Sequence, residues 1–373
     1  MIDIILTLAA LVLSFIFGLI TIPLIISFCR KHKLFDYPGE RKIHHNSIPR
    51  LGGICFFPSA FIATTGVMTW LAFNGEGVEE QLTINLWTLG FITSLVLVYV
   101  LGVIDDIIGL KARLKFIVQI IAACIFPLCG LYVDNLYGLL GINEIPLIIA
   151  YPLTVFIVVF VCNAINLIDG IDGLSSGLST IALCGYFVLF FNESILTYSL
   201  IISAMIGVLL AFMRFNLFGS ESKGHKIFMG DSGSLSLGFV LAFLLLKTIA
   251  VHPDGDIHAE RDVIIGYTML VVPLFDVIRV SFVRMMHKRP VFDADKNHIH
   301  HKLLRTGMSA HWALATIITF ALAIIFLNVV LMNFTNINII VLSDIILWIL
   351  FNNVINFAVR RNGLTPYEIP KKN

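Results

Sequence analysis

Long apolar runs recur along the whole chain, and they constrain its fold more than any other feature. A run of about 20 apolar residues crosses the hydrocarbon core of a bilayer as a helix. Of the 373 residues, 58% are hydrophobic and only 13% are charged, which is too apolar for a soluble domain. The sequence therefore predicts an all-α polytopic membrane protein with about eleven transmembrane helices, at residues 3–28, 52–73, 84–104, 115–132, 147–165, 174–192, 194–213, 232–251, 262–282, 310–332 and 337–358.

The connections between these runs are short, and none is long enough for a separate soluble domain. We expect residues 1–360 to form a single integral-membrane domain and residues 361–373 to form a cytoplasmic tail. The six cysteines lie in or beside apolar runs, without histidines at metal-ligand spacing. We therefore expect buried thiols and neither disulfides nor metal ligands.

Positive charge is concentrated on alternate connections. All of the 25 Lys and Arg residues except Lys247, Arg261 and Arg279 fall on one set. By the positive-inside rule this bias predicts an outer N-terminus and a cytoplasmic C-terminus. The unusual polar motifs lie on the same connections, so we expect the chemistry at the cytoplasmic membrane face.

Residues Asn163–Leu174 place two amides and two carboxylates between two apolar runs. Asp169 and Asp172 are three apart, so on a helix they share one face. A plain connection between two helices does not need this ordered set of polar side chains. The stretch therefore indicates a functional site.

Asp105 and Asp106 end the third apolar run. Adjacent carboxylates at a membrane boundary repel each other unless a cation or basic side chains compensate them. One interpretation is a Mg²⁺ or phosphate site with Lys115 and other basic residues nearby. The other is a solvated helix end balanced by the same bases.

Phe228–Ser234 begins the eighth apolar run with a Gly-Asp-Ser-Gly segment. Free backbone N–H groups at a helix start can meet an anion. Asp231 is either an N-cap or a ligand of Mg²⁺, which typically takes one or two carboxylates and fills its other positions with water and phosphate oxygens. Phe228 is either a lipid anchor or a stacking platform for a base.

Histidines cluster at Asn297–His301, in the longest predicted cytoplasmic connection. Zn²⁺ is one interpretation, but no cysteine accompanies them. Contacts to a phosphate or sugar are a second interpretation, and a basic membrane-surface loop is a third. Asp276 and Arg279, spaced i, i+3, are expected to pair with each other, either as a structural pair or as support for this loop.

Four blocks in order resemble the polyprenyl-phosphate N-acetylhexosamine-1-phosphate transferase superfamily, of the glycosyltransferase family 4 type. They are Arg41–His44 with Ile48–Gly53, Gly102–Asp106, Asn163–Leu174 and Phe228–Ser234. The closing block, Pro273–Asp276 with His298–His301, resembles the bacterial branch that transfers GlcNAc-1-phosphate to undecaprenyl phosphate.

This resemblance implies a role for each candidate residue. Asp105, Asp106 and Asp172 are implied to be catalytic, and Asp231 and Asp169 to bind the metal. The implied nucleotide-binding residues are Asn166, Phe228, Asp169 and Asp172. The sugar and diphosphate are assigned to His298, His300, His301 and Arg289, and the lipid phosphate to Lys42, His44 and Lys115.

The resemblance also implies an enzyme with Mg²⁺ or Mn²⁺ as cofactor. Its partners are a UDP-N-acetylhexosamine and undecaprenyl phosphate, its products a lipid-diphosphate-sugar and UMP, and its place the bacterial plasma (inner) membrane, in a possible homodimer. This is the first membrane step of O-antigen or other cell-envelope polysaccharide synthesis. Another UDP-sugar, including UDP-MurNAc-pentapeptide, stays open as donor. An ion-coupled transporter is the competing class, although transporters place their carboxylates near the bilayer midplane.

Overall fold

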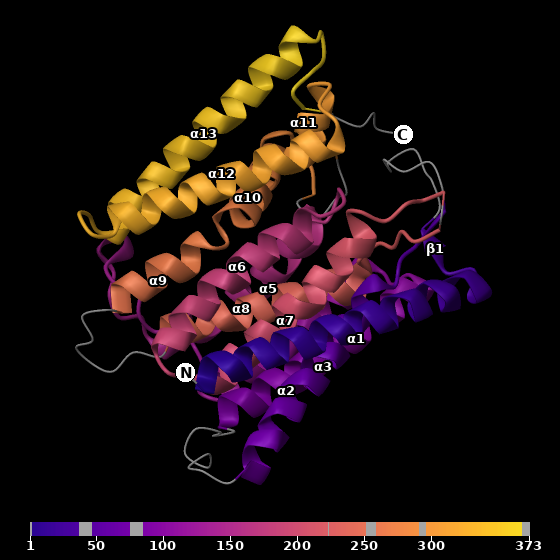
Figure 1. Cartoon of the computed structure of the whole chain (residues 1–373). Helices are drawn as coiled ribbons and strands as arrows, with labels where there is room; N and C mark the ends of the chain where they lie inside the picture. Colours follow the sequence, from indigo (N-terminus) through magenta and orange to yellow (C-terminus); the bar gives the residue numbers. More distant parts are fainter. Residues whose placement is uncertain are drawn as a thin grey trace.

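The computed structural model describes residues 2–36, 47–74, 85–222, 224–250, 259–290 and 296–367. Almost all regular structure in these ranges is helical (Figure 1). The helices are α1 (Ile2–His32), α2 (Phe56–Asn74), α3 (Leu86–Ile108), α4 (Ala112–Leu128), α5 (Leu147–Ile168), α6 (Leu174–Asn192), α7 (Leu196–Asn216), α8 (Gly230–Ala250), α9 (Ala259–Thr268), α10 (Val271–Met286), α11 (Ile299–Arg305), α12 (Ala310–Leu331) and α13 (Ile337–Arg361). The 3₁₀ turns η1 (Gly52–Cys55) and η2 (Leu139–Gly141) and the antiparallel pair β1 (Phe35–Asp36) and β2 (Ile48–Pro49) complete the set.

The prediction of an all-α polytopic membrane protein is confirmed, and helices lie at every predicted span. Within the described ranges, nine helices are long and apolar enough to cross a membrane. The remaining two predicted spans differ in detail, because α4 has only 17 residues and the span predicted at 262–282 is broken. The sidedness of the two termini stays a prediction.

The broken span consists of α9 and α10, which are bent by 65°. Pro273 lies in the first turn of α10 and has no backbone N–H to donate to the preceding turn. A continuous helix would therefore lose a hydrogen bond at this point. With the bent pair counted as one span, ten spans are present in the described ranges, against about eleven predicted.

Helix α8 forms the centre of the molecule and is buried from Ser232 to Thr248. It packs against α3 and α5 along much of its length, with α6 and α9 alongside. Gly238 permits the close approach to α5, because a Cβ there would lie 2.8 Å from the Cα of Cys162. The packing of α8 therefore fixes where the side chains of its first turn lie.

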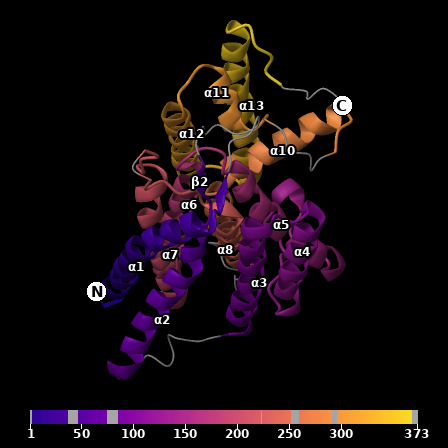
Figure 2. The same cartoon turned by 90° about the vertical axis from the view of Figure 1, so that its right-hand side faces the viewer.

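Helices α12 and α13 lie at the edge of the molecule, as both views show (Figures 1 and 2). In their most apolar stretches only 22% of α12 and 28% of α13 is buried. A second hydrophobic core joins them to α11 and to the α5–α6 connection, through Ile168, Ile171, Leu174, Ile299, Leu303, Ala313, Ile317, Trp348, Ile355 and Val359 among others. The short helix α11 is thus held between the outer helices and the main bundle.

Backbone contacts clamp the segment that leads into α8. The N–H groups of Gly52 and Gly53 donate to the carbonyls of Phe228 and Met229, at 2.9 and 2.7 Å. The N–H of Phe228 donates in turn to the carbonyl of Pro49, at 2.8 Å. A Cβ on Gly53 would lie 2.0 Å from a backbone Cα atom of α8, so this approach requires glycine.

Candidate active site

The ends of α3, α5 and α8 meet at a cavity of about 680 Å³. Consecutive spans run in opposite directions, so the C-terminal ends of α3 and α5 and the N-terminal end of α8 come to the same side. A cavity of this size suits a small ligand. Its lining includes nine of the predicted residues: Asp105, Asp106, Lys115, Asn166, Asp169, Asp172, Phe228, Asp231 and His301.

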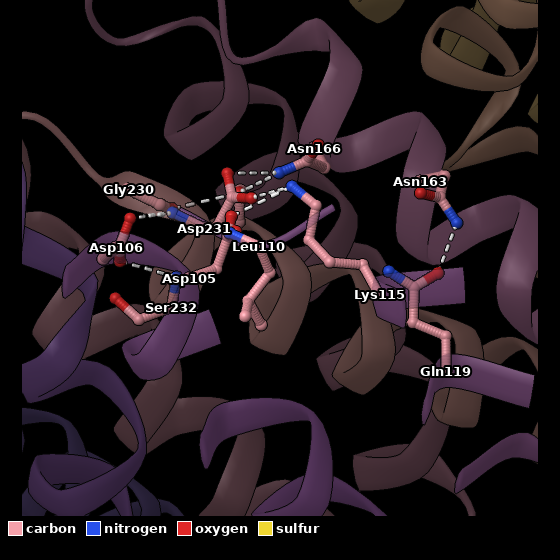
Figure 3. A network of polar contacts seen from close by, with 11 residues as sticks. Asp105, Asp106, Leu110, Lys115, Gln119, Asn163, Asn166, Gly230, Asp231 and Ser232 are labelled. Carbon is pink, nitrogen blue, oxygen red and sulfur yellow. Dashed lines mark hydrogen bonds and ion pairs between the residues drawn. The ribbon is translucent and has the colours of Figure 1, made fainter. Parts of the chain in front are cut away.

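Lys115 lies between two of the carboxylates (Figure 3). Its Nζ is 2.9 Å from Oδ2 of Asp105 and 2.6 Å from Oδ2 of Asp231. Asn166 completes this cluster, because its Nδ2 donates to Oδ1 of Asp231 at 3.1 Å and to Oγ of Ser234 at 2.8 Å. Side chains from α3, α4, α5 and α8 thus form one hydrogen-bonded network.

The two adjacent carboxylates of α3 have different surroundings. Asp105 accepts from Lys115 and from the N–H of Leu110. Asp106 accepts the N–H groups of Asp231 at 2.8 Å and Ser232 at 2.9 Å, one on each carboxylate oxygen. The implied role of the pair in catalysis stays a prediction, but the two side chains are not equivalent.

Asp172 is held by two cavity residues that the sequence analysis missed. Its Oδ2 is 2.7 Å from Nζ of Lys226, and its Oδ1 accepts from Asn216 at 3.3 Å. Neither partner belongs to a recognisable motif. The available signal was that Lys226 is a basic residue only two positions before Phe228 on a predicted cytoplasmic connection.

Asp169 lies in a region of concentrated negative charge. Its pKa is raised to about 7, first by burial and then by the nearby carboxylates of Asp172, Asp231 and Asp106. A positive charge nearby, such as a cationic ligand would supply, would favour the ionised form of Asp169.

A magnesium ion fits these donors on chemical grounds. Within the described ranges no three His, Cys, Asp or Glu side chains form a metal cluster by themselves. Mg²⁺ needs only one or two carboxylates when substrate phosphates and water fill its other positions. Asp231 and Asp169 are the residues predicted to hold it and would offer hard oxygen ligands, and the raised pKa of Asp169 reflects negative charge that the ion would offset.

Of the predicted histidines that the structure describes, His301 alone lines the cavity. Burial and the neighbouring His298 and Arg305 lower its pKa to about 4, so at pH 7 it offers hydrogen bonds and carries no charge. His300 instead packs against the backbone of Gly170, where a Cβ would lie 2.0 Å from its Nε2. Both ring nitrogens of His300 lack a hydrogen-bond partner among the described residues.

His298 belongs to the support of the loop. Its Nδ1 is 2.8 Å from Oδ2 of Asp276, whose Oδ1 accepts from Arg279 at 2.8 Å and from the N–H of Ile299 at 3.0 Å. The predicted pairing of Asp276 with Arg279 is thus present, and the carboxylate anchors the start of α11.

The other residues of the predicted motifs differ in what the structure shows of them. Arg289 follows the end of α10 and does not line the cavity. Lys42 and His44 lie outside the described residues. Asn163 donates to Gln119 at 2.6 Å, beside the carboxylate network (Figure 3). Arg50 lines the cavity although it was predicted only as part of a motif.

Known proteins resemble the chain over most of its length. Residues 88–249 match the sequence profile of glycosyl transferase family 4. A Bacillus subtilis (strain 168) protein named as a probable undecaprenyl-phosphate N-acetylglucosaminyl 1-phosphate transferase is 32% identical over 80% of this chain and 78% of its own length. Undecaprenyl-phosphate alpha-N-acetylglucosaminyl 1-phosphate transferases of Salmonella typhi and Yersinia pestis are 31% and 29% identical, over 85% and 78% of this chain and 82% and 75% of their own lengths.

Proposed function

The chain belongs to glycosyl transferase family 4, and from this we propose that it transfers N-acetylglucosamine 1-phosphate from UDP-N-acetylglucosamine to undecaprenyl phosphate. The relatives carry this activity in their names. The observation that supports it most in this chain is the cavity at the ends of α3, α5 and α8, where Lys115 bridges Asp105 and Asp231.

The proposed reaction is one displacement at phosphorus. An oxygen of the lipid phosphate forms a bond to the β-phosphorus of the UDP-sugar, and the bond from that phosphorus to the bridging oxygen breaks. UMP leaves with the bridging oxygen, and the product is a lipid-diphosphate-sugar. A phosphate monoester has a second pKa near 6, so the acceptor is mostly a dianion at neutral pH and needs little help from a base.

Two polyanions meet in this reaction, so positive charge must offset their repulsion. Lys115, Lys226 and Arg50 line the cavity and are the described basic residues placed to do so. Asp231 and Asp169 would hold Mg²⁺ or Mn²⁺, which when bound supplies further positive charge to the diphosphate. His301, neutral at pH 7, is placed to hydrogen-bond the sugar or the diphosphate.

Phe228 and Asp172 line the same cavity and are proposed to bind the nucleotide, with the uracil stacked on the Phe228 ring. Lys226 and Asn216 hold Asp172 in place for this contact. The lipid chain stays in the bilayer beside a cavity at the helix ends. We place the reaction at the cytoplasmic face of the bacterial plasma membrane, at the first membrane step of O-antigen or another envelope polysaccharide.

The direct test is UMP release by purified protein supplied with undecaprenyl phosphate and a panel of UDP-sugars. We expect UMP only when acceptor, Mg²⁺ and UDP-N-acetylglucosamine are all present. Asp231→Asn should abolish release at every Mg²⁺ concentration. UMP release that does not depend on undecaprenyl phosphate, or that occurs only with UDP-MurNAc-pentapeptide, would contradict the proposed substrates.

A further inference from the structure

The first turn of α8 has no capping side chain of its own. The first N–H groups of a helix have no intrahelical partner, and a polar side chain just before the helix usually accepts from one of them. Here the preceding residue is Met229, which is apolar and buried. Asp106, from the end of α3, instead accepts the N–H groups of Asp231 and Ser232.

This contact between helices is tight on every side. One turn before Asp106, a Cβ on Gly102 would lie 2.5 Å from the Cα of Ser232. Gly230 has φ +75°, and a Cβ there would lie 2.6 Å from Oδ2 of Asp106 and 2.1 Å from the carbonyl oxygen of Arg50. The carboxylate of Asp106 therefore fits against bare backbone, and only 5% of the residue is exposed.

The backbone that Asp106 holds carries the groups of the proposed site. Asp231, whose N–H it accepts, is the residue that Lys115 and Asn166 contact through their side chains. Phe228 lies three residues earlier on the same clamped segment. A displacement of this turn would move the carboxylate of Asp231 and the Phe228 ring together.

We propose that Asp106 is a positioning residue that fixes the orientation of the first turn of α8, and that the two adjacent aspartates have different roles. Asp105, paired with Lys115, faces the reacting groups. Asp106 already accepts a hydrogen bond on each oxygen and acts through Asp231. The expected change in turnover rests on the proposed function, whereas the expected change in backbone hydrogen exchange does not.

The test compares Asp106→Asn with Asp105→Asn in the full-length protein. Asparagine keeps the shape of Asp106 but turns one acceptor into a donor facing a backbone N–H. Hydrogen exchange followed by mass spectrometry should show faster exchange at residues 228–236 in Asp106→Asn and an unchanged rate there in Asp105→Asn. Loss of one charged hydrogen bond should weaken the binding of Mn²⁺, measured by electron paramagnetic resonance, and of UMP, measured by calorimetry, each about tenfold.

Asp105→Asn should differ from it, because UMP binding is retained while turnover is lost. If Asp106→Asn keeps wild-type exchange, Mn²⁺ binding and UMP binding but loses turnover, Asp106 acts directly in the chemistry and the proposal is wrong. Wild-type turnover in Asp106→Asn also overturns it. Absence of UMP release by the unaltered protein with every donor refutes the proposed function and leaves the exchange result to decide on Asp106.

A second variant perturbs the same contact from the α8 side. Gly230→Ala places a methyl group 2.6 Å from Oδ2 of Asp106 and 2.1 Å from the carbonyl oxygen of Arg50, at a positive φ, while leaving both aspartates intact. Because it displaces backbone as well as the carboxylate, we expect less folded protein, and in the folded fraction the faster exchange and the weaker UMP binding of Asp106→Asn. Folded Gly230→Ala protein with wild-type exchange at residues 228–236 would contradict the proposal.

Discussion

Replacing Lys115 by methionine tests the electrostatics of the site most directly. The lysine stem is kept, and the ammonium group that lies 2.9 Å from Asp105 and 2.6 Å from Asp231 is removed. The side chains of all three residues are at most 26% exposed, so solvent screens the pair only in part. The two carboxylates then face each other and the incoming diphosphate without this counter-charge.

The size of the effect follows from these contacts. A hydrogen bond to a charged group contributes about 1.5–3 kcal/mol, and every 1.4 kcal/mol is about a factor of ten. Water that enters the space left by the ammonium group recovers part of the lost free energy. We therefore expect an effect closer to that of one contact than to the sum of the two. Removal of one preorganised donor near developing charge typically costs about 10²–10³ in rate. We therefore expect kcat/KM for UMP release to fall about 10²- to 10³-fold.

The assay is UMP release in detergent, with UDP-N-acetylglucosamine and undecaprenyl phosphate varied in turn. Lys111→Met is the matched control, because Lys111 is exposed at the start of the same helix and makes no side-chain capping bond. It should stay within about threefold of the unaltered protein, the range of a screened surface charge. Near-normal activity in Lys115→Met, or an equal loss in Lys111→Met, would refute the assignment of the charge to the bridging position.

Three other predictions test the frame around the site. Gly53→Ala forces a Cβ to 2.0 Å from the backbone of α8 and should abolish recovery of folded protein, whereas Gly66→Ala, with open space around its Cβ, should be recovered normally in size-exclusion chromatography. Lys226→Gln should raise KM for the UDP-sugar about tenfold and weaken UMP binding in calorimetry, with kcat changed far less; a loss confined to kcat would contradict its nucleotide-side role. Burial lowers the pKa of Lys302 to about 7 from a usual value of 10.5, so the unfolded chain binds more protons between these values and stability should rise with pH. The melting temperature should increase from pH 7 to 9, and Lys302→Met should remove that increase.

The helices, and the gathering of the site residues at one end of the bundle, follow from the sequence because both depend on where the apolar runs begin and end. Length and hydropathy locate each apolar run, and strict alternation of direction brings Asp105, Asn166 and Asp231 to one side. The break at Pro273 was missed because a count of apolar residues treats any long run as one span. The proline is visible in the sequence, but whether a helix bends or ends there depends on its neighbours.

The sequence did not predict that adjacent residues of one motif would have different surroundings. Adjacent residues on a helix point about 100° apart, so His300 and His301 face different surroundings and only His301 reaches the cavity. The same geometry separates Asp105 from Asp106. Which member faces the cavity depends on the rotation of each helix about its axis, and that rotation is set by close packing such as Gly102 against Ser232.

Helix α11 brings His301 to the cavity and packs on one side against α12 and α13, which are only 22% and 28% buried in their most apolar stretches. We expect the outer surfaces of these two helices to contact the surrounding lipid. Bilayer thickness should therefore affect the site, since a thickness that tilts α12 or α13 also shifts α11, which packs against them. Protein in nanodiscs of thin and thick lipids should differ in sugar-nucleotide affinity while the network around Asp231, anchored in the central bundle, stays the same.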